Sequence, residues 1–77
     1  MKIYKYYIVY DLFLTKEERV KKIPRSIELE LYDKIKTVNP ISEMIKEIEL
    51  SNTEDKDIEA GILIHNWKLL DEYEVEE

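Results

Sequence analysis

The alternation of residues 3 to 14 constrains the fold more than any other feature of the chain. The even positions are all apolar or aromatic, at Tyr4, Tyr6, Ile8, Tyr10, Leu12 and Leu14. A period of two with β-branched and aromatic residues is typical of a strand, and the even face is expected to be buried. The odd face is mixed but carries Tyr7, Val9 and Phe13. We therefore predict a central strand, paired on both sides.

A second strand is predicted over residues 26 to 36, with one apolar and one polar face. The charged residues 15 to 25 are interpreted as a long basic hairpin loop, because Pro24 cannot lie within a central ladder. A helix that begins at Ser26 remains the alternative, since apolar residues also fall four apart at Ile27, Leu31 and Ile35.

Asn39 followed by Pro40 predicts a helix start, with Asn39 as the N-cap and Pro40 at the first helical position. One apolar stripe follows, at Ile41, Met44, Ile45 and Ile48, and the helix should end near residues 50 to 52. A last strand is predicted over residues 60 to 70. The acidic residues 71 to 77 are expected to fray.

This order predicts an α+β domain of ββαβ type, a three-stranded antiparallel sheet in the order 2-1-3 with one helix packed on one face. Residues 1 to 70 form the domain and 71 to 77 an acidic tail. The expected core lies between the helix and the sheet. Its residues are Tyr6, Ile8, Leu29, Leu31, Met44, Ile45, Ile48 and Ile64. A domain of 77 residues buries a modest core, so a homodimer is expected to add stability.

Composition excludes several kinds of site. The chain has no cysteine and one histidine, which excludes disulfides and thiolate metal sites and argues against zinc. The sequence has no segment that resembles a membrane helix or a targeting peptide, and we expect a protein of the bacterial cytosol. His65 is interpreted as a half-buried strand histidine that is bonded to a backbone group. Asp11 is interpreted as a carboxylate at a strand end. We expect no catalytic residue, no metal and no cofactor.

Charge is divided unevenly along the chain. Residues 1 to 40 hold nine Lys/Arg and six Asp/Glu, a net of +3, and residues 41 to 77 hold three and twelve, a net of −9. Such asymmetry bears on partners rather than on fold. A possible anion-binding set lies in the hairpin segment, at Lys16, Arg19, Lys21, Lys22 and Arg25. A possible partner-binding set combines open-face aromatic residues with carboxylates that imitate phosphates, at Tyr7, Trp67, Glu43, Glu47, Asp55 and Asp57.

The chain resembles small uncharacterised ββαβ proteins from phages and other mobile elements of low-GC bacteria. The resemblance lies in the opening strand KIYKYYIVYDLFL, the ELEL segment, the helix NPISEMIKEIE and the closing strand ILIHNWKLL. The basic ERVKKIPR segment departs from it, because glycines would be expected there. The resemblance implies an accessory protein, of a class that includes inhibitors of host defence, and it implies no catalytic residue.

Two functions remain open. The first is a non-enzymatic protein that binds and inhibits a host macromolecule, such as a defence protein that itself binds nucleic acid. It makes no direct contact with nucleic acid or membrane. The second is a binder of a small nucleotide signal that uses the basic hairpin at a dimer interface, with tyrosines as stacking faces. A flat exposed surface favours the first, and a deep pocket lined by Lys/Arg and Tyr between two copies favours the second.

Overall fold

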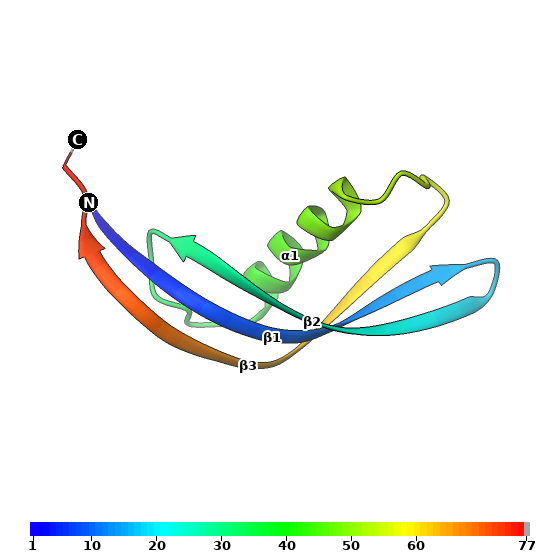
Figure 1. Cartoon of the computed structure of the whole chain (residues 1–77), viewed down its shortest axis with the longest axis horizontal. Coiled ribbons are helices and arrows are strands. Elements are labelled where there is room, and N and C mark those ends of the chain that lie inside the picture. Colours follow the sequence, from blue (N-terminus) through cyan, green and yellow to red (C-terminus); the bar gives the residue numbers. More distant parts are fainter. Residues whose placement is uncertain (77) are drawn as a thin grey trace.

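The protein is a three-stranded antiparallel sheet with one helix on one face (Figure 1). The computed structural model describes residues 1 to 76. The chain runs through β1 (Lys2–Lys16), β2 (Arg19–Leu31), α1 (Asn39–Ser51) and β3 (Glu59–Glu74). The sheet order is β2-β1-β3, and β1 is antiparallel to both neighbours. This confirms the predicted α+β fold class, and the rival helix at residues 26 to 36 is wrong.

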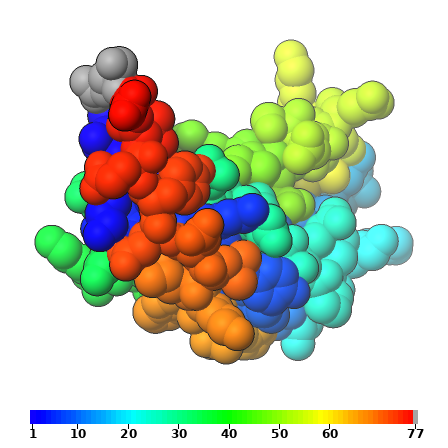
Figure 2. All heavy atoms as spheres, turned by 60° about the vertical axis from the view of Figure 1, so that its left-hand side comes forward, coloured from blue at the N-terminus to red at the C-terminus, as the bar shows by residue number. Residues whose placement is uncertain are grey.

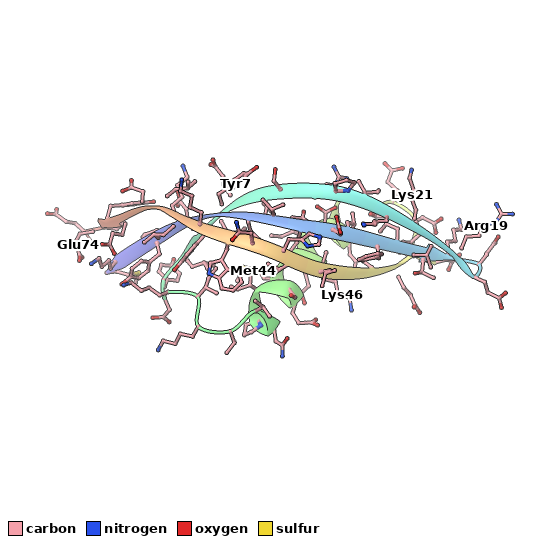
Figure 3. All side chains as sticks on the ribbon, turned by 90° about the horizontal axis from the view of Figure 1, so that it is seen from below. Tyr7, Arg19, Lys21, Met44, Lys46 and Glu74 are labelled. Carbon is pink, nitrogen blue, oxygen red and sulfur yellow. The ribbon has the colours of Figure 1, made fainter. Side chains whose placement is uncertain are left out.

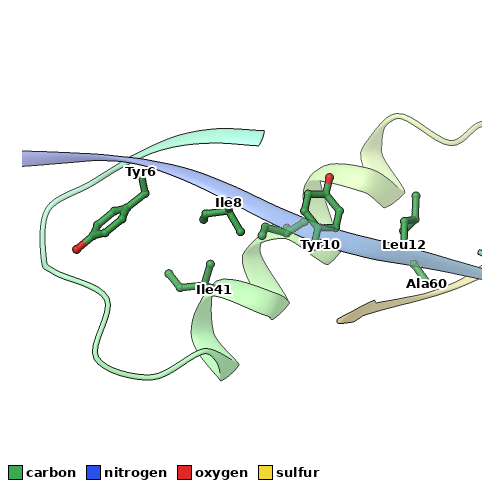
Figure 4. Close-up of a cluster of buried hydrophobic side chains, with 7 residues drawn as sticks. Tyr6, Ile8, Tyr10, Leu12, Ile41 and Ala60 are labelled. Carbon is green, nitrogen blue, oxygen red and sulfur yellow. The ribbon is translucent and has the colours of Figure 1, made fainter. Parts of the chain in front are cut away.

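The core lies between α1 and the even face of β1, as the alternation predicts. Figure 4 shows the cluster, in which β1 side chains meet the helix and the start of β3. Its buried members are Tyr6, Ile8, Tyr10, Leu12, Ile41, Ile45 and Ala60. Leu29, Leu31 and Ile64 pack against it from the flanking strands. Met44 was expected in the core but is 40 % exposed, because α1 turns Ile41 and Ile45 inward instead.

Both buried tyrosines satisfy their hydroxyl groups. Tyr10 donates to Oε1 of Glu49 on α1 at 2.6 Å, and the Tyr6 hydroxyl accepts the backbone N–H of Ile35 at 3.1 Å. Burial and the adjacent Glu49 carboxylate raise the pKa of Tyr10. Because a buried hydroxyl without a partner is costly, these contacts fix the helix and the β2–α1 connection over the sheet.

The hairpin between β1 and β2 differs most from the prediction. Glu17 and Glu18 form a two-residue turn, so the expected long basic loop is instead the first half of β2. Pro24 lies within that strand, opposite Asp11. A proline without an N–H is tolerated there because β2 is an edge strand.

Three other boundaries also need correction. β2 ends at Leu31 rather than near Lys36, although Ile35 still packs against the core. Val38, not Asn39, is the N-cap, and its carbonyl accepts the first helical bond from the Ser42 N–H. β3 continues to Glu74, where it pairs with Lys2, so residues 71 to 74 are part of the sheet rather than a frayed tail. Glu77 lies outside the described residues.

The molecule is elongated because the sheet extends beyond the helix at both ends. Its extents are 47 × 25 × 17 Å, and its radius of gyration is 14.2 Å, whereas a compact chain of this length would have about 11 Å. A helix of 13 residues spans about 20 Å, and a strand of 15 residues spans about 50 Å. The helix therefore covers less than half of the strand length. Figure 2 shows the last part of β3 beside the start of β1.

Candidate interaction surfaces

Tyr7 and Trp67, expected together on the open face, lie on opposite faces of the sheet. Cross-strand partners in an antiparallel pair point to the same side. Trp67 pairs with Ile8, whose side chain faces the helix, whereas Tyr7 is an odd residue of β1 that pairs with Glu28 and Lys68. Both are exposed, Tyr7 at 38 % and Trp67 at 42 %. They therefore cannot form one contact surface on one face.

A polar cluster crosses the open face at its centre. Asp11 is the one buried charged residue of the described chain, at 6 % exposure. Its Oδ2 lies 2.6 Å from Nε2 of His65 on β3 and 3.5 Å from Nζ of Lys22 on β2. The hydrogen bond to His65 is the main cause that lowers the pKa of Asp11, and Lys22 adds to it. The three strands are thus tied together by one carboxylate.

This cluster revises the expectation for both residues. Asp11 is buried in the middle of β1 rather than exposed at a strand end, and His65 bonds to a carboxylate rather than to a backbone group. The His65 side chain is 48 % exposed. A β-bulge falls beside it, because the register of β3 on β1 shifts between Val9 and Tyr10. An extra residue in one strand re-aims a side chain, and here the side chain is directed to Asp11.

Ion pairs within the chain neutralise most of the basic hairpin residues. Lys22 pairs with Asp11, Arg25 with Glu49, and Lys16 with Asp55 in the loop after α1. The contact with Lys16 holds the pKa of Asp55 below its ordinary value. Among the described residues, Arg19 and Lys21 have no ion-pair partner within 4 Å. Figure 3 shows these two toward one end of the molecule and Glu74 at the other.

A groove at the hairpin end brings part of the basic set together. It has a volume of about 460 Å³ and is lined by Leu14, Lys16, Glu17, Arg19, Val20, Lys21 and Ile58. Lys22 and Arg25 are not among the lining residues, and neither is any tyrosine. This groove within one chain therefore offers no tyrosine face on which a nucleotide base could stack. An anion with an apolar part is the ligand class that its lining would accept.

The expected acidic set lies on α1 and on the loop that follows it. Glu43 and Glu47 are exposed and one helical turn apart. Asp57 is exposed, and its backbone N–H donates to Asp55 at 2.9 Å. Glu43, Glu47 and Asp57 form no ion pair among the described residues, whereas Asp55 is bound to Lys16. Lys46 and Lys56 lie between these acids in the sequence.

Two features were not found from the sequence. A second groove, of about 530 Å³, lies between the β2–α1 connection and the start of the helix. Its lining includes Tyr32, Lys34, Ile35, Lys36, Ile41 and Met44, and it lies within one chain. The second feature is the exposed apolar content of β3, at Leu63, Trp67, Leu69 and Leu70. The strand prediction assigned these residues to a closing strand, and only the register shows how many remain uncovered.

Comparison with known proteins found no matching family model, no curated relative and no similar solved structure. Within the described residues, no helix is long and apolar enough to cross a membrane. The function must accordingly be inferred from the surfaces of the chain itself.

Proposed function

We propose that this chain is a non-enzymatic accessory protein, of the phage type that the sequence resembles, which binds and blocks a host protein. The proposed partner is a protein with a basic, nucleic-acid-binding surface, such as a defence protein of the bacterial host. The proposed contact is made by the outer side of α1 and the loop that leads to β3, presented in the host cytosol.

One observation carries this proposal, namely the unequal use of charges within the chain. The hairpin cations Lys16, Lys22 and Arg25 are paired internally. The carboxylates of Glu43, Glu47 and Asp57 form no ion pair in the described chain and stay exposed. Free carboxylates one helical turn apart, about 6 Å along the axis, can occupy sites that otherwise bind phosphates. Charge complementarity of this kind raises association rates.

The test uses proteins of a candidate bacterial host that are retained on heparin, a polyanion that selects basic nucleic-acid-binding surfaces. The immobilised protein should retain a member of this fraction. Purified, that partner should lose its nucleic-acid binding or its activity when the protein is added. Its affinity for the protein should fall steeply between about 50 and 300 mM salt, because the attraction is screened within about 10 Å.

Matched variants assign the surface. Glu43→Gln/Glu47→Gln/Asp57→Asn should slow association about tenfold or more. Asp55 is left unchanged so that its bond to Lys16 remains. Arg19→Gln/Lys21→Gln removes the two unpaired cations of the hairpin and should leave the affinity within about twofold. If only the second variant loses binding, the proposal is wrong.

A second candidate function rests on the groove at the hairpin end. Arg19 and Lys21 line it without ion-pair partners, beside the apolar Leu14 and Ile58. Such a groove would hold a small anionic ligand, the nucleotide-signal alternative without tyrosine stacking. Loss of function confined to Arg19→Gln/Lys21→Gln would favour this candidate.

A further inference from the structure

The outer edge of β3 is the largest unused surface for strand pairing in the described chain. β3 is 16 residues long, and its only strand neighbour is β1. Backbone groups that point away from β1 therefore have no strand partner. Four exposed apolar side chains lie along this strand, at Leu63, Trp67, Leu69 and Leu70. A long edge of this composition is a template for pairing with another strand.

The opposite edge, β2, is protected by comparison. Pro24 lies near its middle and cannot donate to a ladder. Its first half is strongly charged, with Arg19, Lys21, Lys22 and Arg25. Charges and proline on an edge strand are the usual means of preventing association. β3 contains no proline and carries its apolar residues in the centre.

The charges along β3 would be complementary between two copies of the strand paired antiparallel. The segment from His65 to Lys68 carries no acid, whereas Asp71, Glu72 and Glu74 follow. Antiparallel pairing of two copies sets the first part of one strand against the second part of the other. Neither Lys68 nor Asp71 is in an ion pair within the described chain. Both residues thus have a charge available for a second copy.

The faces of the sheet select the register. Lys68 pairs with Tyr7, and Asp71 with Lys5, so both side chains lie on the open face. Trp67 and Glu72 pair with Ile8 and Tyr4 and lie on the helix face. Partners across a continuous sheet must share a face. Lys68 opposite Asp71 of a second copy meets this condition on the open face, and the same register places Trp67 opposite Glu72 on the helix face.

The β-bulges leave regular segments of β3 on both sides of the proposed contact. β3 shifts register on β1 between Lys5 and Tyr6 and between Val9 and Tyr10. Residues 66 to 69 of β3 lie between the two shifts. Residues 71 to 74 lie on the C-terminal side of the shift at Lys5 and Tyr6. Each is a regular segment that can extend a ladder. In the register above, residues 66 to 68 of one copy pair with residues 71 to 73 of the other, all within regular segments, and the two-fold axis falls between Leu69 and the bulge residue Leu70.

We propose that two copies of this chain pair through β3 about a two-fold axis, with Lys68 of each opposite Asp71 of the other. The result is a six-stranded antiparallel sheet with both helices on one side. An isologous contact of this kind repeats each favourable pair twice. The dimer is independent of the proposed function, because the β3 edge is separate from the outer side of α1.

Charge exchange tests the pairing, with molecular mass read by light scattering. The wild-type protein should have twice the monomer mass of 9.4 kDa at about 100 µM. Lys68→Asp and Asp71→Lys each place two like-charge pairs at the interface and should raise the dimer dissociation constant about tenfold or more. The double variant Lys68→Asp/Asp71→Lys should restore the wild-type value. A monomeric wild-type protein, or single variants that dimerise as well as the wild type, would overturn the proposal.

Cysteine trapping locates the contact, and the absence of native cysteine makes it specific. Lys68→Cys/Asp71→Cys should form a dimer linked by disulfides under mild oxidation. The two positions are about 10 Å apart within one strand, too far to bridge internally. Arg19→Cys/Lys22→Cys gives the same spacing on the β2 edge and should stay unlinked. Equal amounts of disulfide-linked dimer from the two variants would refute the proposed pairing through β3.

Discussion

At the scale of single residues, the turn between β1 and β2 is conformationally strained. Glu17 and Glu18 have φ angles of 51° and 66°, in the left-handed region. A two-residue hairpin turn with both φ values positive is the type I′ turn, which favours Asn-Gly. The left-handed conformation costs a residue with a Cβ about 1 to 2 kcal/mol.

Replacing the two residues should therefore stabilise the fold. We predict that Glu17→Asn/Glu18→Gly raises the free energy of unfolding by about 1 to 2 kcal/mol, measured by urea denaturation. Glu17→Gln/Glu18→Gln removes the same charges and keeps the strain, so it serves as the control. If the free energy of unfolding rises equally in both variants, charge repulsion rather than backbone conformation is the cause.

Asp11 makes the stability depend on pH. Its pKa is lowered in the folded state, mainly by the hydrogen bond to His65, from an unfolded value of about 3.9. A lowered folded pKa contributes stability above the unfolded value, and this stability is lost as the pH falls through the folded value. The stability difference between wild type and Asp11→Asn should thus narrow as the pH falls from about 5 toward 2.

Urea denaturation at a series of pH values measures this difference. Asp33→Asn removes an exposed carboxylate without an ion pair and serves as the control. If the stability difference between wild type and Asp11→Asn stays constant down to the lowest pH, the assigned role of Asp11 is contradicted.

At the scale of elements, α1 is held by few but deeply buried side chains. Ile45 is fully buried, whereas Met44 beside it is 40 % exposed. Ile45→Ala should destabilise the fold by about 2 to 4 kcal/mol, through lost transfer energy and the cavity left behind. Met44→Ala removes a side chain of similar size and should cost less than about 1 kcal/mol. Comparable losses in the two variants would mean that α1 packs in a different orientation.

The elements that could be predicted are those in which periodicity and burial agree. β1 alternates over residues 3 to 14, and α1 has a proline in its first turn and an apolar stripe, so both were found. The start of β2 was missed because the Pro24 rule for central ladders does not apply to an edge strand. The continuation of β3 to Glu74 was missed because its acidic residues are neutralised across the sheet, where Glu72 pairs with Lys2 and Glu74 with the N-terminal amine of Met1.

The candidate surfaces were harder to predict, because they depend on register. Asp11 and His65 are 54 residues apart, and no local pattern links them. Trp67 would face the open side if β3 followed the register set at Lys2 and Glu74, but one β-bulge shifts the pairing by a residue and reverses its face. Bulges leave little signal in a single sequence, and this limits any prediction of which side chains share a surface.

At the scale of the whole molecule, shape and charge follow from the same architecture. A sheet longer than its helix leaves the β3 edge and two grooves uncovered. One groove lies beside the start of α1, and the other lies at the hairpin end of the sheet. Pairing through β3 would cover the edge and leave both helices free on one side. The proposed dimer would then present two acidic surfaces to a partner, which increases avidity without a new contact.

The ends of the chain lie side by side, since Lys2 pairs with Glu74 and the Val75 N–H donates to the Met1 carbonyl at 2.8 Å. A short linker could therefore join them without disturbing a strand. The cyclised chain could then be cut between Glu17 and Glu18, where the backbone is strained and the tip is exposed. Such a circular permutant would begin with β2 and end with β1, keep every strand pairing, and free the turn of its two left-handed residues.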